Sequence, residues 1–105
     1  MYTRHVTMRL KRNAAPELTK TLANVIIPML RKQKGFRDEV TCVAPERLEA
    51  VSVSLWETKE DAEAYNRTAY PDALKSLASV VENNPKVQTF EVTNSTFHDI
   101  GVQAV

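Results

Sequence analysis

The sequence is poor in cysteine and glycine, and both shortages exclude kinds of site. Its 105 residues include one cysteine and two glycines. The single Cys42 cannot form an internal disulfide, which favours a reducing compartment and predicts a cytoplasmic protein. Gly35 and Gly101 lie far apart, so no glycine-rich loop is present to cradle phosphate groups. The absence of a CxxC pair, a Ser–His–Asp spacing and a paired-carboxylate signature leaves hydrolase and zinc sites without support.

Long apolar runs and an excess of one charge are also missing. No stretch approaches the roughly 20 apolar residues that span a bilayer, and the opening MYTRHVTMRL has no signal-peptide core. The formal net charge is +1, whereas proteins that bind nucleic acid normally carry a basic stripe. We therefore expect neither a membrane nor a nucleic acid as a partner.

Alternation predicts the first strand, and helical spacing predicts the helix after it. Residues 2–11 alternate between apolar and polar, and the apolar face carries Val6, Met8 and Leu10. Residues 13–34 then favour a helix, which Pro28 should kink by removing a backbone donor and Gly35 should terminate. The apolar stripe of this helix consists of Leu18, Leu22, Val25, Ile26 and Met29.

A hairpin follows the first helix. Residues 36–43 and 48–57 both alternate, and only the turn at 44–47 separates them. The side chains expected to face the core are Phe36, Val40, Cys42, Val51, Val53 and Leu55. Cys42 is therefore expected to be inert core.

A second helical arm and a last strand complete the chain. Thr58 is expected to cap the arm, whose inner face carries Ala62, Tyr65 and Ala69. Pro71 interrupts the arm, and a second segment presents Leu74, Leu77, Ala78 and Val81. Residues 86–96 predict a strand with Phe90 and Val92 inward, and residues 97–105 form an apolar tail within the same single domain, 1–105.

The element order predicts the fold class. Strand, helix, strand, strand, helix, strand is typical of ferredoxin-like α+β domains, in which a four-stranded antiparallel sheet carries both helices on one face. The other face is expected to carry His5, Thr7, Arg9, Thr41, Ser52, Ser54, Trp56, Thr89 and Glu91. Because this face is semi-polar and β-branched, we expect it to pair with a second copy in a symmetric homodimer, with a solvated monomer as the alternative.

Two segments resemble the antibiotic biosynthesis monooxygenase superfamily. They are Lys34-Gly35-Phe36 and VSVSLWETKEDAEAYNRTAYPDAL, residues 51–74, and the resemblance extends over residues 2–92. It implies a dimeric α+β barrel, and the better-known enzymes of this family oxygenate an electron-rich phenol without metal or flavin. Some relatives degrade haem, but this chain has Leu74 and Lys75 near the place of their axial histidine, so haem ligation is not expected.

Five residues are candidates for the site that this resemblance implies. Trp56 is a candidate pocket wall whose indole N–H holds a substrate oxygen. Tyr65, where many relatives carry histidine, is a candidate donor to a phenolate, and His5 is a candidate base. Asn66 and Tyr70 are expected to contact substrate from the same wall. Each residue also has a structural interpretation, as a packing aromatic, a structural histidine or a solvated amide.

Two further pairings depend on the first and last strands being neighbours. His5 then approaches His98, and Asp99 completes a set of two histidines and one carboxylate. The spacing is too weak to assign a metal, and none is assigned. Arg9 and Glu91 are expected to form a cross-strand ion pair.

The sequence leaves three functions open. The first is a cofactor-independent monooxygenase acting on a small aromatic or enolic molecule, and the second is a non-catalytic small-ligand-binding or structural dimer. The third is an isomerase or decarboxylase on the same scaffold. A cavity of roughly 300 Å³ or more with converging polar groups favours a ligand site, whereas a filled interior favours the structural dimer. Oxygen consumption separates the first function from the third.

Overall fold

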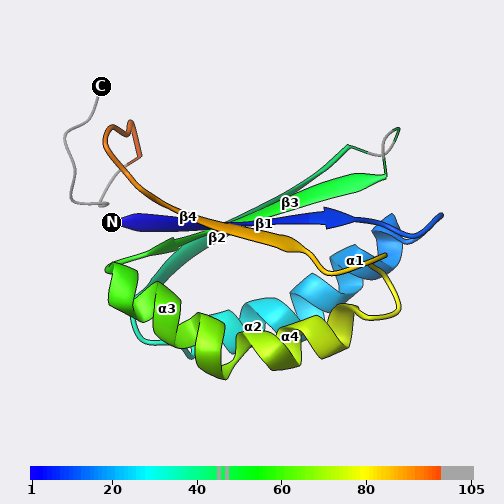
Figure 1. Cartoon of the computed structure of the whole chain (residues 1–105), viewed down its shortest axis with the longest axis horizontal. Helices are drawn as coiled ribbons and strands as arrows, with labels where there is room; N and C mark the ends of the chain where they lie inside the picture. The colour runs from blue at the N-terminus through cyan, green and yellow to red at the C-terminus, as the bar shows by residue number, and fades with distance from the viewer. Residues whose placement is uncertain (45, 47, 98–105) are drawn as a thin grey trace.

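A four-stranded antiparallel sheet forms one layer of the molecule, and the helices lie against one of its faces (Figure 1). The computed structural model describes residues 1–44, 46 and 48–97. The strands are β1 (Tyr2–Arg9), β2 (Phe36–Ala44), β3 (Glu49–Trp56) and β4 (Lys86–Glu91). The helical segments are α1 (Ala15–Thr21), the π-helix η1 (Leu22–Ile26), α2 (Ile27–Arg31), α3 (Lys59–Thr68) and α4 (Tyr70–Leu77). The sheet order β2-β3-β1-β4 confirms the predicted ferredoxin-like α+β fold.

The first helical arm, made of α1, η1 and α2, absorbs Pro28 by changing its helical register. Just before Pro28 the backbone N–H of Ile27 donates to the carbonyl of Leu22, five residues back, which is the π-helical pattern. The buried residues of the arm recur every fourth position, at Leu18, Leu22, Ile26 and Leu30. Because an α-helix has 3.6 residues per turn, the wider π-turns keep this four-residue stripe on the sheet side.

The predicted stripe of this arm was wrong at Val25. Its side chain is 42% exposed, whereas Leu30, which was not assigned to the stripe, is 3% exposed. The α-helical spacing used for the prediction does not hold across η1, and this shifts the buried positions beyond it. Ile27 lies off the predicted stripe and packs against the core all the same.

The two faces of the sheet are assigned differently on β3 from what the sequence predicted. Arg4 pairs with Ser54 and Val6 pairs with Ser52, so these serines share the helix-covered face. Val51 and Val53, expected in the core, lie instead opposite Thr7 and His5 on the open face. Trp56 also faces the helices and is fully buried. Alternation identified the two sets of side chains correctly but assigned each set to the wrong face, because both sets contain apolar residues.

The outer strands required the same correction. Val40 and Phe90 are 55% and 47% exposed, and Cys42 is exposed rather than inert core. Thr41, Thr89 and Glu91, expected on the open face, pair with Ser52, Arg4 and Tyr2 and lie on the helix-covered side. The open face is the side of the sheet that carries His5, Val40, Cys42, Val51, Val53 and Phe90. It is more apolar than predicted, and no helix among the described residues covers it (Figure 1).

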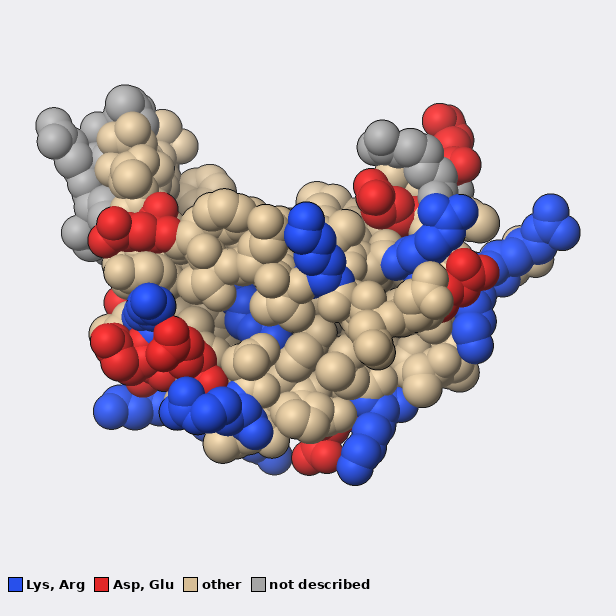
Figure 2. Space-filling model, viewed as in Figure 1, with Lys and Arg blue, Asp and Glu red and all other residues tan. Residues whose placement is uncertain are grey.

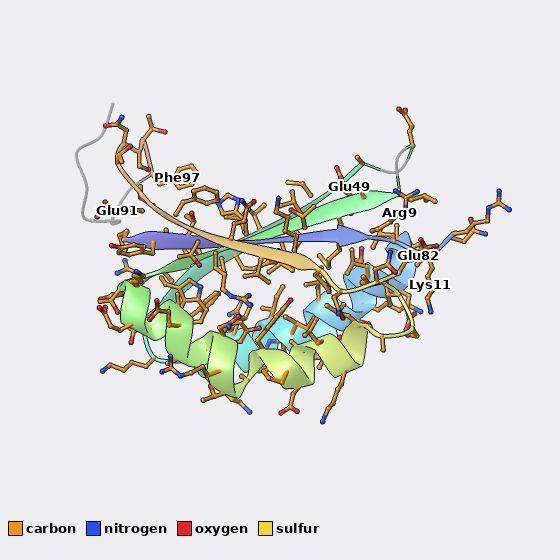
Figure 3. All side chains as sticks on the ribbon, viewed as in Figure 1. Arg9, Lys11, Glu49, Glu82, Glu91 and Phe97 are labelled. Atoms are coloured by element: carbon orange, nitrogen blue, oxygen red, sulfur yellow. The ribbon has the colours of Figure 1, made fainter. Side chains whose placement is uncertain are left out.

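The expected pair between Arg9 and Glu91 does not form. Arg9 lies opposite Glu49 and its Nε is 3.5 Å from Glu82 Oε2, whereas Glu91 pairs with Tyr2 at the other end of β1. Figure 3 shows Arg9 and Glu91 at opposite ends of the sheet. Antiparallel pairing of β1 with β4 was predicted correctly, but it brings the start of one strand to the end of the other.

The second helical arm follows its predicted signals closely. Thr58 Oγ1 accepts a hydrogen bond from the backbone N–H of Asp61 at 3.0 Å, which confirms the cap. The arm breaks at Ala69, and Pro71 lies in the first turn of α4. Its last segment is shorter than expected, because α4 ends at Leu77, and β4 ends at Glu91 rather than at residue 96. Among the described residues, no helix combines the length and apolarity that crossing a membrane requires.

Gly35 provides a test of this packing. Its φ is +80°, and a Cβ at this position would overlap the Asp61 side chain. We predict that Gly35→Ala lowers the free energy of unfolding by more than the roughly 1–2 kcal/mol that a left-handed backbone alone costs an L-residue. Urea denaturation measures the change, with the exposed Lys34→Ala as the matched control. Equal stability of Gly35→Ala and the unmodified protein would contradict this assignment.

Candidate functional site

A small cavity lies between the helix-covered face of the sheet and the helices, and is called the central cavity below. Aliphatic side chains of β1, the first helical arm and α4 form most of its wall. The polar side chains that reach it are Arg4, Ser52, Ser54, Tyr65 and Tyr70. The space open to the centre of a water molecule is about 30 Å³. This is enough for a water molecule and far below the roughly 300 Å³ of a typical ligand pocket.

A row of aromatic rings forms one side of the site. Trp56 stacks on Tyr65 with ring centroids 5.2 Å apart, and Tyr65 lies 6.0 Å from Tyr70. Phe36 also meets Trp56 edge-on, with ring centroids 5.6 Å apart. The structure therefore brings together three of the predicted site residues: Trp56, Tyr65 and Tyr70.

Within this row Trp56 is fully buried, and it does not line the central cavity. Its indole Nε1 donates to Ser54 Oγ at 2.8 Å, so the donor expected to hold a substrate oxygen is already used. Ser54 in turn lies 3.5 Å from the backbone oxygen of Arg4. The position of Trp56 is thus fixed by stacking on Tyr65 and by one hydrogen bond to the sheet.

Arg4 is the one buried basic side chain among the described residues, and it lies against the two tyrosines. Arg4 is only 3% exposed. The guanidinium carbon lies 3.9 Å from the ring centroid of Tyr70 and 5.1 Å from that of Tyr65, which is cation–π geometry. None of the ion pairs found among the described residues includes it. Burial lowers the pKa of Arg4, and the neighbouring tyrosines offset part of that effect.

Asn66 holds one end of the Arg4 side chain. Arg4 Nη2 donates to Asn66 Oδ1 at 2.7 Å, whereas Arg4 Nε has no hydrogen-bond partner within the protein. The Tyr70 hydroxyl is buried and also has no partner. The guanidinium lies over the ring of Tyr70, and Arg4 counteracts the rise in the pKa of Tyr70 by its charge and by a side-chain hydrogen-bond interaction that falls outside normal hydrogen-bond geometry.

The environment of the tyrosines opposes their ionisation. Burial raises the pKa of Tyr65 from 10.0 to about 12, and the positive charge of Arg4 offsets part of that increase. Burial likewise raises the pKa of Tyr70, and Arg4 again works against it. Both side chains are therefore neutral hydrogen-bond donors near neutral pH.

His5 lies apart from the other candidates. It is on the open face, where Nε2 is 3.0 Å from Thr3 Oγ1 and the ring meets Phe90 edge-on at 4.9 Å. The sheet separates it from the central cavity. His98 and Asp99, its predicted partners, lie outside the described residues. No cluster of three or more potential metal ligands occurs in the part of the chain that the structure describes.

Glu39 reaches the site through a hydroxyl, and the sequence analysis missed it. Glu39 Oε2 accepts hydrogen bonds from Thr41 Oγ1 and, at 2.7 Å, from Ser52 Oγ. Ser52 lines the central cavity, and Glu39 lines a separate surface groove between β2 and the first helical arm. A chain of two polar side chains thus connects the interior to solvent.

Arg4 was also missed, although the sequence contained the signal for it. Arg4 has the same parity as Val6 and Met8, which were correctly placed on the apolar face of β1. A charged residue in phase with a core-facing set is a buried charge by prediction, and buried charges are normally paired or functional. Glu39 carried no such signal, because its face depends on the register of β2 beside β3.

The tyrosines give a testable pH dependence. The folded pKa of Tyr65 is above its unfolded value, so between pH 10 and about 12 the unfolded chain has lost a proton that the folded chain keeps. The free energy of unfolding should therefore fall as pH rises through this window, by at most about 1.4 kcal/mol per pH unit for one tyrosine. Denaturation at several pH values measures the slope, which Tyr65→Phe should reduce. An unchanged slope in Tyr65→Phe would contradict the assigned environment.

Comparison with solved structures supports the fold. A monooxygenase from Streptomyces coelicolor, ActVA-Orf6 in complex with the ligand nanaomycin D, superposes with a TM-score of 0.75 at 13% identity, covering 90% of this chain and 88% of that one. SnoaB, a cofactor-independent oxygenase from Streptomyces nogalater, gives 0.68 at 11% identity, with 90% and 94% covered. The NE2512 protein of unknown function from Nitrosomonas europaea gives 0.71 at 13% identity, with 87% of each chain covered.

At these identities the structural likeness establishes the fold and not the activity. No curated protein is similar enough in sequence to count as a match. The sequence profile of one family, however, matches residues 1–74, the part that runs from β1 into α4 and contains Arg4, Trp56, Tyr65 and Tyr70. Because the match covers more than half of the 105 residues, the chain belongs to the antibiotic biosynthesis monooxygenase family.

Proposed function

We propose that the protein is a cofactor-independent monooxygenase that acts on a small aromatic or enolic molecule in the central cavity. The observation that carries the proposal is the pair of neutral tyrosines, Tyr65 and Tyr70, facing an apolar cavity beside the buried cation of Arg4. Burial alone disfavours the anion of a phenol or enol here, and the charge of Arg4 is the group that stabilises it. Family membership and the oxygenases among the structural relatives support the same function.

The proposed reaction needs a proton acceptor, and Glu39 supplies one through Ser52. The substrate hydroxyl gives its proton to Ser52 Oγ as Ser52 gives its own to Glu39, 2.7 Å away. The substrate anion then passes one electron to dioxygen, and the substrate radical and superoxide recombine to a peroxide anion, which takes the proton back from Glu39 through Ser52 and becomes a hydroperoxide. Loss of one water molecule leaves a quinone, so one oxygen atom enters the product and the other leaves as water. We assign no step in this cavity to His5, because it lies across the sheet.

The remaining candidates act by position. Tyr65 donates a hydrogen bond to the developing anion, and Trp56 holds the Tyr65 ring in place by stacking on it. Asn66 acts through Arg4, because its Oδ1 accepts a hydrogen bond from Arg4 Nη2. Tyr70 provides the aromatic ring against which the Arg4 guanidinium packs. Trp56 and Asn66 are therefore positioning residues in this proposal, and Tyr65 is the residue that contacts substrate.

A second candidate function is a non-catalytic dimer, and the size of the cavity favours it. About 30 Å³ of open space accommodates water but no aromatic ring. Under the first function a substrate must therefore separate the helices from the sheet, whereas under the second the aromatic row is simply core. Oxygen uptake that depends on a phenol distinguishes the two.

We further propose that the open face forms a homodimer in the cytoplasm. Val40 on β2 and Phe90 on β4 are large apolar side chains about half exposed on that face, and exposed apolar surface is typical of protein interfaces. Pairing would bury the open faces of both copies and close a barrel, as is general in this family. Cys42, the single cysteine, is an exposed free thiol on the same face, which is compatible with a reducing compartment.

The enzymatic proposal predicts a specific loss of activity in Tyr65→Phe. Removing one hydrogen-bond donor to a developing anion typically lowers kcat by about 100-fold. Oxygen consumption with a polycyclic phenol as substrate measures it, and Tyr2→Phe, a tyrosine on β1 outside the cavity lining, is the matched control. No substrate-dependent oxygen uptake by the unmodified protein would support the non-catalytic dimer instead.

The dimer proposal predicts that Val53→Lys dissociates the protein. A lysine in the middle of the open face, opposite His5, would bury an unpaired charge on pairing. Light scattering should give twice the 11.9 kDa chain mass for the unmodified protein and 11.9 kDa for the variant. Val25→Lys, on an exposed part of the first helical arm, should leave the mass unchanged. A folded unmodified protein at 11.9 kDa under dilute conditions would overturn the proposal.

A further inference from the structure

Arg4 is a buried cation whose counter-charge is missing from the protein. It is 3% exposed, yet its partners are two aromatic faces and one neutral amide. A buried cation is tolerated when an anion pairs with it or when hydrogen bonds satisfy all its donors. Neither condition holds here, because no ion pair among the described residues includes Arg4 and its Nε is unpartnered.

The donors left available have the geometry of a fork. Nε–H and one N–H of Nη2 point in parallel from the same edge of the planar guanidinium, and this arrangement binds both oxygens of a carboxylate. In Arg4, Nε is unpartnered and Nη2 is held by Asn66, an exposed and uncharged side chain. A carboxylate can take the free position and displace the weaker neutral acceptor from the other.

A second unpartnered donor faces the same space. Tyr70 lines the central cavity beside Arg4, and its buried hydroxyl has no partner of hydrogen-bond geometry within the protein. Because burial raises its pKa, this hydroxyl keeps its proton. The Tyr70 oxygen interacts with Arg4, but the proton of this hydroxyl and Arg4 Nε–H still lack an acceptor of good geometry, and an anion can supply one for both.

A route to this position is open on the surface. A groove between β4 and α3, called the β4–α3 groove, contains about 310 Å³ of space and has Arg4 and Asn66 in its wall. Arg67, Val87 and Thr89 also line it, together with Glu63, whose carboxylate lies 3.9 Å from Lys59 Nζ. On the face seen in Figure 2, most charged side chains gather toward the ends, and the mainly uncharged middle also contains Lys or Arg atoms. Arg4 therefore separates a solvent-filled groove from the apolar cavity.

We infer that Arg4 binds the carboxylate of a ligand whose apolar or aromatic part enters the central cavity. The carboxylate lies at the junction of groove and cavity, on Arg4 Nε and Nη2, with the Tyr70 hydroxyl close by. The apolar part meets the aliphatic wall that includes Val6, Met8 and Ile26. This inference deepens the proposed function by naming its ligand class as hydrophobic or aromatic carboxylic acids, and it rests on the central cavity being a ligand site.

The test compares a carboxylate with a neutral ligand of the same shape. Binding of benzoate, benzamide and the much smaller formate to the full-length protein is followed by the fluorescence of Trp56, the only tryptophan. Trp56 stacks on Tyr65, which lies beside Arg4, so a ligand there changes its emission. We expect benzoate to bind about 30-fold more tightly than benzamide, the ratio that loss of a buried charged pair produces.

Variants assign that preference to Arg4. Arg4→Met should abolish the difference between benzoate and benzamide, and Arg4→Lys, which keeps the charge without the fork, should weaken benzoate by about tenfold. Arg12→Met removes an exposed arginine and should behave like the unmodified protein. Circular dichroism tests whether each variant is folded. If Arg4→Met does not fold, Arg4→Lys still tests the inference.

Each outcome decides the inference separately from the oxygenase proposal. Equal affinity for benzoate and benzamide, no response to either benzoate or formate, or full benzoate binding by a folded Arg4→Met or Arg4→Lys overturns it. Carboxylate binding without any oxygen consumption would uphold this inference and remove the oxygenase proposal. Oxygen consumption on neutral phenols by an unmodified protein that binds benzoate and benzamide equally would do the reverse.

Discussion

Strand alternation forces the guanidinium of Arg4 into an apolar layer, and the rest of the site is arranged around it. Arg4 shares its face of β1 with Val6 and Met8, so it cannot reach solvent without turning these two outward. Tyr65 and Tyr70 provide aromatic faces for the charge, and Asn66 anchors one end. Burying such a group with unsatisfied donors is unfavourable for stability, which is the usual signature of a site retained for function.

Small residues on β3 leave room for this arrangement. Ala50, Ser52 and Ser54 face the helices where larger side chains would fill the layer, and the tyrosine rings and the guanidinium occupy that space. The two serines also carry the polar links of the site, from Ser54 to Trp56 and from Ser52 to Glu39. With these small residues on the helix-covered face, the larger apolar side chains of β3, such as Val53, lie on the open face. One choice of side-chain size thus serves both the cavity and the face proposed to pair.

The sequence predicted the elements and their topology well, because these depend on local signals. The Thr58 cap, the left-handed Gly35 and the break before Pro71 each fix a boundary without reference to distant residues. The aromatic row was predictable in part, since Tyr65 was expected to face inward from its helix, whereas Trp56 was assigned to the open face of the sheet.

The faces of the sheet were less predictable for a physical reason. On β3 both sets of alternating side chains are compatible with burial, and hydrophobicity alone chooses the valines as core. Val25 was misplaced because Pro28 imposes a π-helical turn, which changes the spacing of buried residues. The involvement of Glu39 depends on the pairing register of β2, and no local pattern encodes that.

The stability of Arg4→Met tests most directly whether the guanidinium belongs to a ligand site or to the structural core. Its unfolding free energy is measured by urea denaturation at neutral pH, without added ligand, beside that of the unmodified protein. If Arg4 is an uncompensated charge kept for a ligand, an apolar side chain of similar length should leave stability equal or increase it. A loss of several kcal/mol would mean that the charge is integral to the folded core, and would contradict this account.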